Sequence, residues 1–123
     1  MIMGLKCMHE LSILFCGDFA PYLRYEPLVL KQTKNIFGDF LGYIENSDFA
    51  FVNLETPLCN EGVKIEKSGP HIRAHPNCIN AISAAGFDIV GLANNHIMDY
   101  GAFGLKSTIA ACERAGIARV GAG

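Results

Sequence analysis

Three short apolar runs recur along the chain: SILFC at 12–16, FAFVN at 49–53 and DIVGL at 88–92. Each run is too short for a helix and leads into a loop that contains Gly, Asn or Pro. Apolar runs of this length between turn residues are typical of buried strands in a parallel sheet. The pattern therefore predicts three parallel strands, and ARVGAG at 118–123 predicts the start of a fourth strand and a turn.

The segment between the first two runs has a helical pattern. Its apolar residues recur at spacings of three and four, which predicts one amphipathic helix from about 28 to 46. Gly38 and Gly42 are expected to weaken this helix without ending it, because an interior glycine lowers helix stability by only a modest amount.

Two further helices are predicted later in the chain. One covers 75–87, since Pro76 suits the first turn of a helix and Gly86 can adopt the left-handed conformation that ends one. The other runs from about 102 to 115 and stops at Gly116. Strands that alternate with helices predict right-handed crossovers and an α/β fold, in which helices pack on a mostly parallel sheet.

One long irregular stretch, ETPLCNEGVKIEKSGPHIR, covers residues 55–73. Its length and its Gly, Pro and charged residues favour a functional flap or a small hairpin over a linker between domains. With 123 residues, half of them hydrophobic, the chain is long enough to bury a core, and residues 1–123 are predicted to form a single domain.

Charge and composition argue against several classes of partner. The net charge is −2 and the Lys and Arg residues are scattered, which argues against nucleic acid and anionic membranes. The chain has no apolar stretch of transmembrane length and no signal-peptide core, so we expect no membrane segment and a cytoplasmic location. The five cysteines, at positions 7, 16, 59, 78 and 112, form no CxxC pair and fit a reducing compartment. Cys16, Cys78 and Cys112 lie in apolar contexts and are predicted to be small core residues.

Side chains that can bind ligands follow each of the three strands. In an open α/β sheet, ligands bind beyond the carboxyl ends of the strands, and parallel strands bring those ends to one edge. The segments CGDFAP, NLETP and ANNHIMD supply Asp18, Asn53, Glu55, Asn94, Asn95, His96 and Asp99. Carboxylate, amide and imidazole donors suit a hard or borderline divalent metal, so the pattern predicts a site for Mg, Mn, Fe(II) or Zn.

Each candidate residue also has a purely structural interpretation. Asp18 can form an Asx turn, and Glu55 can be a solvated loop residue or cap a turn. Asn95 can adopt a left-handed turn conformation, His96 can be a hydrogen-bonded loop histidine, and Asp99 can cap the helix near 102.

Two other features carry a weaker signal. His71 and His75 are expected to be substrate contacts or a cap rather than a joint ligand pair, because a proline-started helix follows them. The VGAG segment at 120–123 suggests a nucleotide-binding α/β domain, but the dinucleotide pattern needs a helix after its glycines.

The segments CGDFAP, VNLETPL and AAGFDIVGLANNHIMDYGAFGLKSTIAACERAGIARVGAG together resemble the CapA-type capsule-synthesis proteins. This family is also called the poly-γ-glutamate biosynthesis family and lies in the calcineurin-like metallophosphoesterase superfamily. The resemblance covers about 12–123, and LANNH-x-x-D-x-G is its most specific part. It implies an αββα sandwich with a two-metal site at the strand ends, of which this chain is the amino-terminal half.

The resemblance also implies a role for each candidate residue. Asp18 takes the place of the first metal-binding aspartate, Glu55 that of the bridging carboxylate, and Asn95 that of the metal-binding asparagine of the G-N-H motif. His96 takes the place of the motif's histidine, a general acid or transition-state contact, with Asp99 orienting its imidazole. The implied cofactors are divalent ions, Mn, Fe, Zn or Mg, up to two in number.

The chain departs from the superfamily pattern at two positions. Ala20 stands where the D-x-H motif has a metal-binding histidine, and Asn53 competes with Glu55 for the place of the second motif's aspartate. We expect a truncated domain with an uncovered apolar sheet, which favours self-association, and with weak metal binding.

The resemblance predicts a capsule or poly-γ-glutamate biosynthesis protein with a metal-dependent, phosphoesterase-like hydrolase site. Its substrate would be a phosphoester or polymer-precursor small molecule. The alternative is a non-enzymatic accessory protein for polymer synthesis, with a vestigial metal site.

Overall fold

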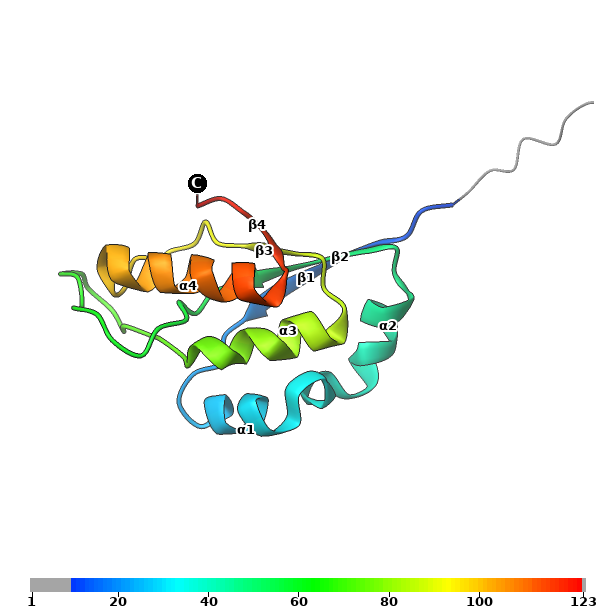
Figure 1. Cartoon of the computed structure of the whole chain (residues 1–123), viewed down its shortest axis with the longest axis horizontal. Helices are drawn as coiled ribbons and strands as arrows, with labels where there is room; N and C mark the ends of the chain where they lie inside the picture. Colours follow the sequence, from blue (N-terminus) through cyan, green and yellow to red (C-terminus); the bar gives the residue numbers. More distant parts are fainter. Residues whose placement is uncertain (1–9, 123) are drawn as a thin grey trace, which may run out of the picture.

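The computed structural model describes residues 10–122, so Cys7 lies outside the described residues. Four parallel strands form one sheet in the order β1-β2-β3-β4, and helices pack against it (Figure 1). The strands are β1 Ile13–Phe19, β2 Phe49–Leu54, β3 Ile89–Gly91 and β4 Ala118–Val120. The α/β fold with a parallel sheet is therefore confirmed.

The helices lie on one face of this sheet. Each strand pairs with the next strand along the chain, and right-handed crossovers in a constant direction place every connecting helix on the same side. Figure 1 shows the helices gathered on that side of the strands. Along β2, Ala50, Val52 and Leu54 point toward the helices and are buried in the core.

The long helix predicted between the first two strands is wrong, because the segment is broken into three pieces. These are α1 Tyr25–Gln32, the 3₁₀ segment η1 Thr33–Phe40 and α2 Leu41–Asn46. Thr33 has a φ of 48° and Gly38 a φ of 52°, and both values lie in the left-handed half of backbone space. A residue in that conformation interrupts a right-handed helix, so Gly38 ends a helical piece that it was expected only to weaken.

The two later helices are confirmed, with their ends. The 3₁₀ turn η2 Pro76–Cys78 leads into α3 Ile79–Ala85, and Gly86 ends the helix with a φ of 94°. Helix α4 covers Gly101–Ala115, and Gly116 ends it with a φ of 68°. Both glycines take the left-handed conformation that was predicted for Gly86.

The opposite face of the sheet is open over residues 10–122, so the expected uncovered apolar sheet face is confirmed. Phe15 on β1 is 73% exposed, and Phe49 on β2 is exposed as well. The Phe15 and Phe51 rings lie 5.7 Å apart on this face. Phe51 also covers Gly91, where an added Cβ would lie 2.8 Å from the ring. We call the apolar side chains of this surface the open face: the exposed Ile13, Phe15, Phe49 and Val120 and the half-buried Phe51 and Ile89.

The irregular stretch after β2 contains no helix or strand within its described length. Its two ends are joined by a single parallel bridge between Leu58 and Ala74, so the small-hairpin alternative is wrong. We call residues 60–73 the flap. Gly62 anchors it against the start of α4, because an added Cβ there would lie 3.1 Å from the Cβ of Tyr100.

Cys59, Cys78 and Cys112 are buried, Cys16 is half-buried, and all four are free thiols. Burial raises the pKa of Cys78 to about 12 and that of Cys112 to about 11. Such thiols stay protonated and pack as small apolar side chains, as predicted for positions 16, 78 and 112. Among residues 10–122, no helix has both the length and the apolar character needed to cross a membrane.

Candidate functional site

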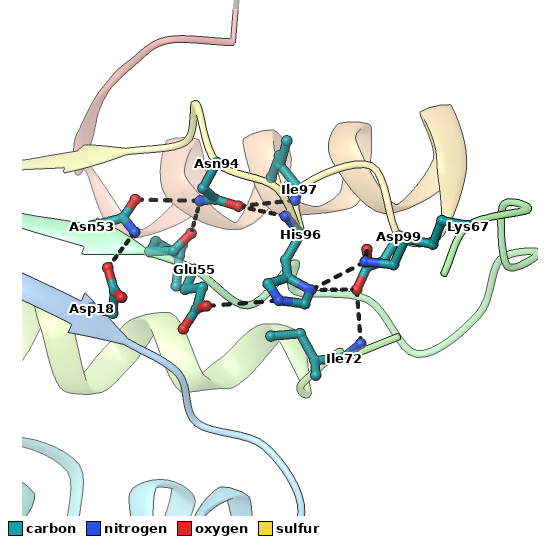
Figure 2. A network of polar contacts seen from close by, with 10 residues as sticks. Asp18, Asn53, Glu55, Lys67, Ile72, Asn94, His96, Ile97 and Asp99 are labelled. Atoms are coloured by element: carbon teal, nitrogen blue, oxygen red, sulfur yellow. Dashed lines mark hydrogen bonds and ion pairs between the residues drawn. The ribbon is translucent and has the colours of Figure 1, made fainter. Parts of the chain in front are cut away.

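The carboxyl ends of β1, β2 and β3 lie side by side and carry the candidate residues (Figure 2). Asp18 pairs in register with Asn53, and Asn53 pairs in turn with Gly91. The loop after β3 therefore starts beside the ends of the other two strands. The structure brings Asp18, Glu55 and His96 to one edge of the sheet.

His96 lies between two carboxylates. Its Nδ1 is 2.8 Å from Oδ2 of Asp99, and its Nε2 is 3.7 Å from Oε1 of Glu55. Because a carboxylate only accepts hydrogen bonds, the contact with Asp99 requires a proton on Nδ1, and Nε2 is directed toward Glu55. The imidazole therefore has one fixed nitrogen and one nitrogen available to the site.

Asp99 is fully buried, and its carboxylate accepts bonds from three donors. These are Nδ1 of His96, the ammonium of Lys67 and the amide of Ile72, the last at 2.8 Å. Burial raises the pKa of Asp99, but the hydrogen bonds from Lys67, His96 and Ile72 outweigh it and hold the pKa below its ordinary value. Asp99 is therefore ionised at neutral pH. The helix-cap alternative is wrong, because the N-cap of α4 is Tyr100 and Asp99 directs its carboxylate elsewhere.

Asn94 shapes the loop that carries His96. Its Oδ1 accepts bonds from the amides of His96 and Ile97, both at 3.0 Å, and its Nδ2 donates to the carbonyl of Leu54 at 2.9 Å. An asparagine oxygen that accepts from amides two and three residues ahead forms an Asx turn. The sequence pattern included Asn94 only as one of several ligand-type residues. Its position two residues before His96 is the signal that could have indicated the Asx turn.

Asn95, the predicted metal ligand, is exposed, and the polar network of Figure 2 passes through Asn94 instead. Nδ2 of Asn53 donates to Oδ1 of Asp18 at 2.6 Å, and Oδ1 of Asn53 lies 3.3 Å from Nδ2 of Asn94. Asn53 therefore links the strand ends, and Glu55, just after β2, is the freer of the two candidates at the end of this strand. The Asx-turn alternative for Asp18 is wrong, because Asp18 lies within β1 and bonds across to β2.

Lys67 is a site residue that the sequence pattern did not reveal. It comes from the flap and contacts Asp99 and, at 3.4 Å, Nδ1 of His96. A lysine in an irregular stretch has no periodicity or spacing that links it to a strand end, so only the folded chain identifies it.

The two other histidines within residues 10–122 have structural partners. Nε2 of His71 lies 2.7 Å from the carbonyl oxygen of Ile65 within the flap. Nδ1 of His75 accepts a bond from the amide of Asn77 at 3.1 Å and caps η2. The cap interpretation is thus confirmed for His75.

The residue types of the predicted metal ligands suit a divalent ion. Asp18, Glu55 and Asn95 offer two carboxylates and one amide, which are oxygen donors suited to hard cations. Among residues 10–122, no three His, Cys, Asp or Glu side chains are grouped closely enough to hold a metal ion by themselves. Nδ1 of His96 is already engaged by Asp99, which leaves its Nε2 as the available nitrogen at this edge.

The glycine segment near the chain's end has a packing role. Gly121 has a φ of 91°, and an added Cβ would lie 2.6 Å from the Cβ of Ala93. Because Gly121 has no Cβ, the chain can pass this close to the start of the loop that carries Asn94 and His96. This packing accounts for the glycine without a nucleotide.

Comparison with known protein families gives one match over most of the chain. Residues 12–123 match the family described as "Bacterial capsule synthesis protein PGA_cap". The chain is 38% identical over 118 residues to "Capsule biosynthesis protein CapA" of Bacillus anthracis, which covers 93% of this chain and 29% of that protein.

Two other relatives extend the comparison. A "Probable polyglutamine synthesis accessory protein" of Mycobacterium tuberculosis strain H37Rv is 39% identical over 89 residues, covering 71% of this chain and 23% of that protein. "PGA biosynthesis protein CapA" of Bacillus subtilis is 29% identical over 116 residues, covering 92% and 30%. The chain thus spans less than a third of the length of these curated relatives.

Proposed function

Because the chain belongs to the PGA_cap family of bacterial capsule synthesis proteins, we propose that it serves capsule or poly-γ-glutamate production through a metal-dependent, phosphoesterase-like hydrolytic site. The observation that carries this proposal is the placement of His96 between buried Asp99 and the more open Glu55. An imidazole oriented by a buried carboxylate, with its second nitrogen left for the reacting group, is a recurring arrangement for acid–base catalysis.

His96 is the general acid of the proposed reaction. Asp99 holds the proton of Nδ1 and fixes the plane of the ring, so Nε2 is the atom that exchanges a proton with the substrate. In phosphoester cleavage, Nε2 would carry a second ring proton and deliver it to the leaving oxygen, while Nδ1 keeps its proton on the bond to Asp99. A positioned acid of this kind contributes about 10²- to 10⁴-fold to the rate.

Asp18, Glu55 and Asn95 are the residues proposed to hold divalent metal, Mn, Fe, Zn or Mg. When bound, such a metal lowers the pKa of a coordinated water and stabilises negative charge on the phosphoryl group. Asn53 keeps the carboxylate of Asp18 in place through its 2.6 Å bond, and Asn94 holds the loop of Asn95 in its turn. The substrate is proposed to be a phosphoester or a phosphorylated polymer precursor of small size.

The test is hydrolysis of an aryl phosphate by the protein expressed from its complete gene, with metal content measured on the same sample. We expect His96→Ala to lower turnover by about 10²-fold or more while metal content stays unchanged. His75→Ala is the matched control, since this histidine caps η2 instead of facing the site. Unchanged hydrolysis in His96→Ala would reject the role of His96.

A second candidate function is that of a non-enzymatic accessory protein with a vestigial site. It is favoured by the name of the mycobacterial relative, an accessory protein, and by Ala20, which stands where the superfamily's D-x-H motif has a histidine. The same pair of measurements separates the candidates. An accessory protein would show neither bound metal nor hydrolysis above the rate of the His96→Ala variant.

A further inference from the structure

The flap meets the proposed site through Asp99. The amide of Ile72 donates to Oδ2 of Asp99 at 2.8 Å, and the amide of Ile65 donates to the Asp99 carbonyl at 3.1 Å. The ammonium of Lys67 contacts the remaining carboxylate oxygen, Oδ1. Three flap residues thus bond to the residue that orients His96.

The charges at this contact balance. Asp99 is fully buried and ionised, and a buried carboxylate needs a compensating positive charge as well as hydrogen bonds. Lys67, with a side chain only 19% exposed, supplies that charge from the flap. Lys67 therefore balances the charge of Asp99 from the flap.

The same contact limits where the imidazole can bond. With Lys67 on Oδ1 and the Ile72 amide sharing Oδ2, the ring of His96 reaches Asp99 only through Oδ2. That placement directs Nε2 toward Glu55 at 3.7 Å. Lys67 contacts the Nδ1 side of the ring and not the Nε2 side, so it acts through Asp99.

From these contacts we infer that Lys67 is a positioning residue of the strand-end site. Its ion pair with Asp99 holds the flap against the site and fixes the orientation and tautomer of His96. The consequence for catalysis rests on the function proposed above, whereas the contact between the flap and the site does not.

The inference is tested with three variants of the protein expressed from its complete gene. Lys67→Met removes the charge and keeps the length of the side chain, and Lys67→Arg retains the charge. Lys64→Met is the matched control, because Lys64 is an exposed lysine of the same flap. The readouts are kcat and KM for an aryl phosphate, the ¹⁵N shifts of the His96 ring, and hydrogen exchange at the Ile65 and Ile72 amides.

We expect Lys67→Met to lower kcat by about 10- to 100-fold with a smaller change in KM, as for other residues that orient a reacting group. The His96 ring should lose its single Nδ1–H tautomer, and both flap amides should exchange faster. Lys67→Arg should restore most of each readout, and Lys64→Met should change none. Because the ring shifts and the exchange rates need no turnover, an inactive wild-type protein would reject the proposed function and still leave this inference testable.

Two outcomes would overturn the inference. One is a Lys67→Met protein whose ring shifts and amide exchange match the wild type. The other is a loss of kcat in Lys67→Met that Lys67→Arg does not rescue, together with an equal fall in thermal stability in both variants. That result would assign Lys67 a purely structural role.

Discussion

The two sides of the strand-end site are built in opposite ways. On one side, buried His96 and Asp99 are tied to each other and to Lys67 of the flap. On the other side, exposed Asp18 has a bond from Asn53, itself only half-buried. The first side is thus determined by the fold, whereas the second leaves carboxylate oxygen free for a ligand.

The difference also follows from where each side lies on the sheet. Asn53 alternates with Val52 and Leu54 along β2, so it shares the open face with Phe51. Asp18 is its neighbour in register. His96 and Asp99 lie instead in the loop that leads into α4, which the helices and the flap help to bury. Hence the buried His96 and Asp99 are held in place by the fold, whereas Asp18 on the open face is accessible to a ligand.

Replacing the buried carboxylate should have the largest effect. Asp99→Asn leaves Lys67 without its counter-charge and removes one acceptor from the bonds to His96 and Ile72. Breaking one partner of a buried pair costs about 3 to 5 kcal/mol of unfolding free energy. Urea denaturation of the variant measures this loss. A loss near zero would mean that the buried side contributes no more to stability than the exposed side.

Acid should reduce the difference in stability between the wild type and Asp99→Asn. Burial raises the pKa of Asp99, but the hydrogen bonds from Lys67, His96 and Ile72 lower it by more than burial raises it. The folded-state pKa of Asp99 therefore lies below the unfolded value of about 3.9. The stabilisation is complete above that unfolded value and is lost as the pH falls through the folded pKa. The stability gap between wild type and Asp99→Asn should therefore narrow in acid.

The control for this pH series is Asp48, an exposed carboxylate at the far end of the sheet. Hydrogen bonds from the backbone and side chain of Ser12 lower its pKa. The difference in unfolding free energy between wild type and Asp48→Asn should be smaller, and it should also shrink as the pH falls. A gap for Asp99→Asn that stays constant down to strongly acidic pH would show that folding does not lower the pKa of Asp99.

The open face should control self-association. Phe15, 73% exposed, is the aromatic side chain most available for contact between copies, so we expect Phe15→Ser to shift an oligomer toward monomer. Light scattering at several concentrations measures the shift. Tyr43→Ser, at an exposed aromatic residue on α2, is the control and should leave the mass unchanged. A wild-type chain that is monodisperse and monomeric would contradict the prediction.

The smallest effect on stability is expected at Asp18. Because this side chain is exposed and bonded to Asn53, Asp18→Asn should leave the urea midpoint indistinguishable from that of the wild type. Its bound metal should fall, since an amide is a weaker ligand than a carboxylate. A large loss of stability would show that the exposed side is as much a part of the fold as the buried side.

The strands and the later helices could be predicted because local patterns determine them. Apolar runs and glycine stops carry the information for β2, α3 and α4 within a few residues. The breaks in the first helical segment could not be predicted this way. Thr33 takes a left-handed φ that its β-branched side chain disfavours, and Gly38 takes one that interrupts the helix.

The candidate site was predictable only as far as chain order allows. Parallel strands place Asp18, Glu55 and His96 at one edge, and any parallel sheet with these residues would do so. Lys67 could not be predicted, because its contact with Asp99 depends on how an irregular segment folds back over 32 positions. The choice between Asn94 and Asn95 depends on turn geometry, which residue type alone does not determine.

The strand order carries a consequence for how the chain folds during synthesis. Each strand pairs with the strand made immediately before it, so the sheet can grow in the order in which the ribosome releases it. The flap emerges before Asp99 and has no carboxylate to bond until the third strand and its loop have left the exit tunnel. The site is therefore assembled only when the loop of His96 docks on two strand ends that are already in place.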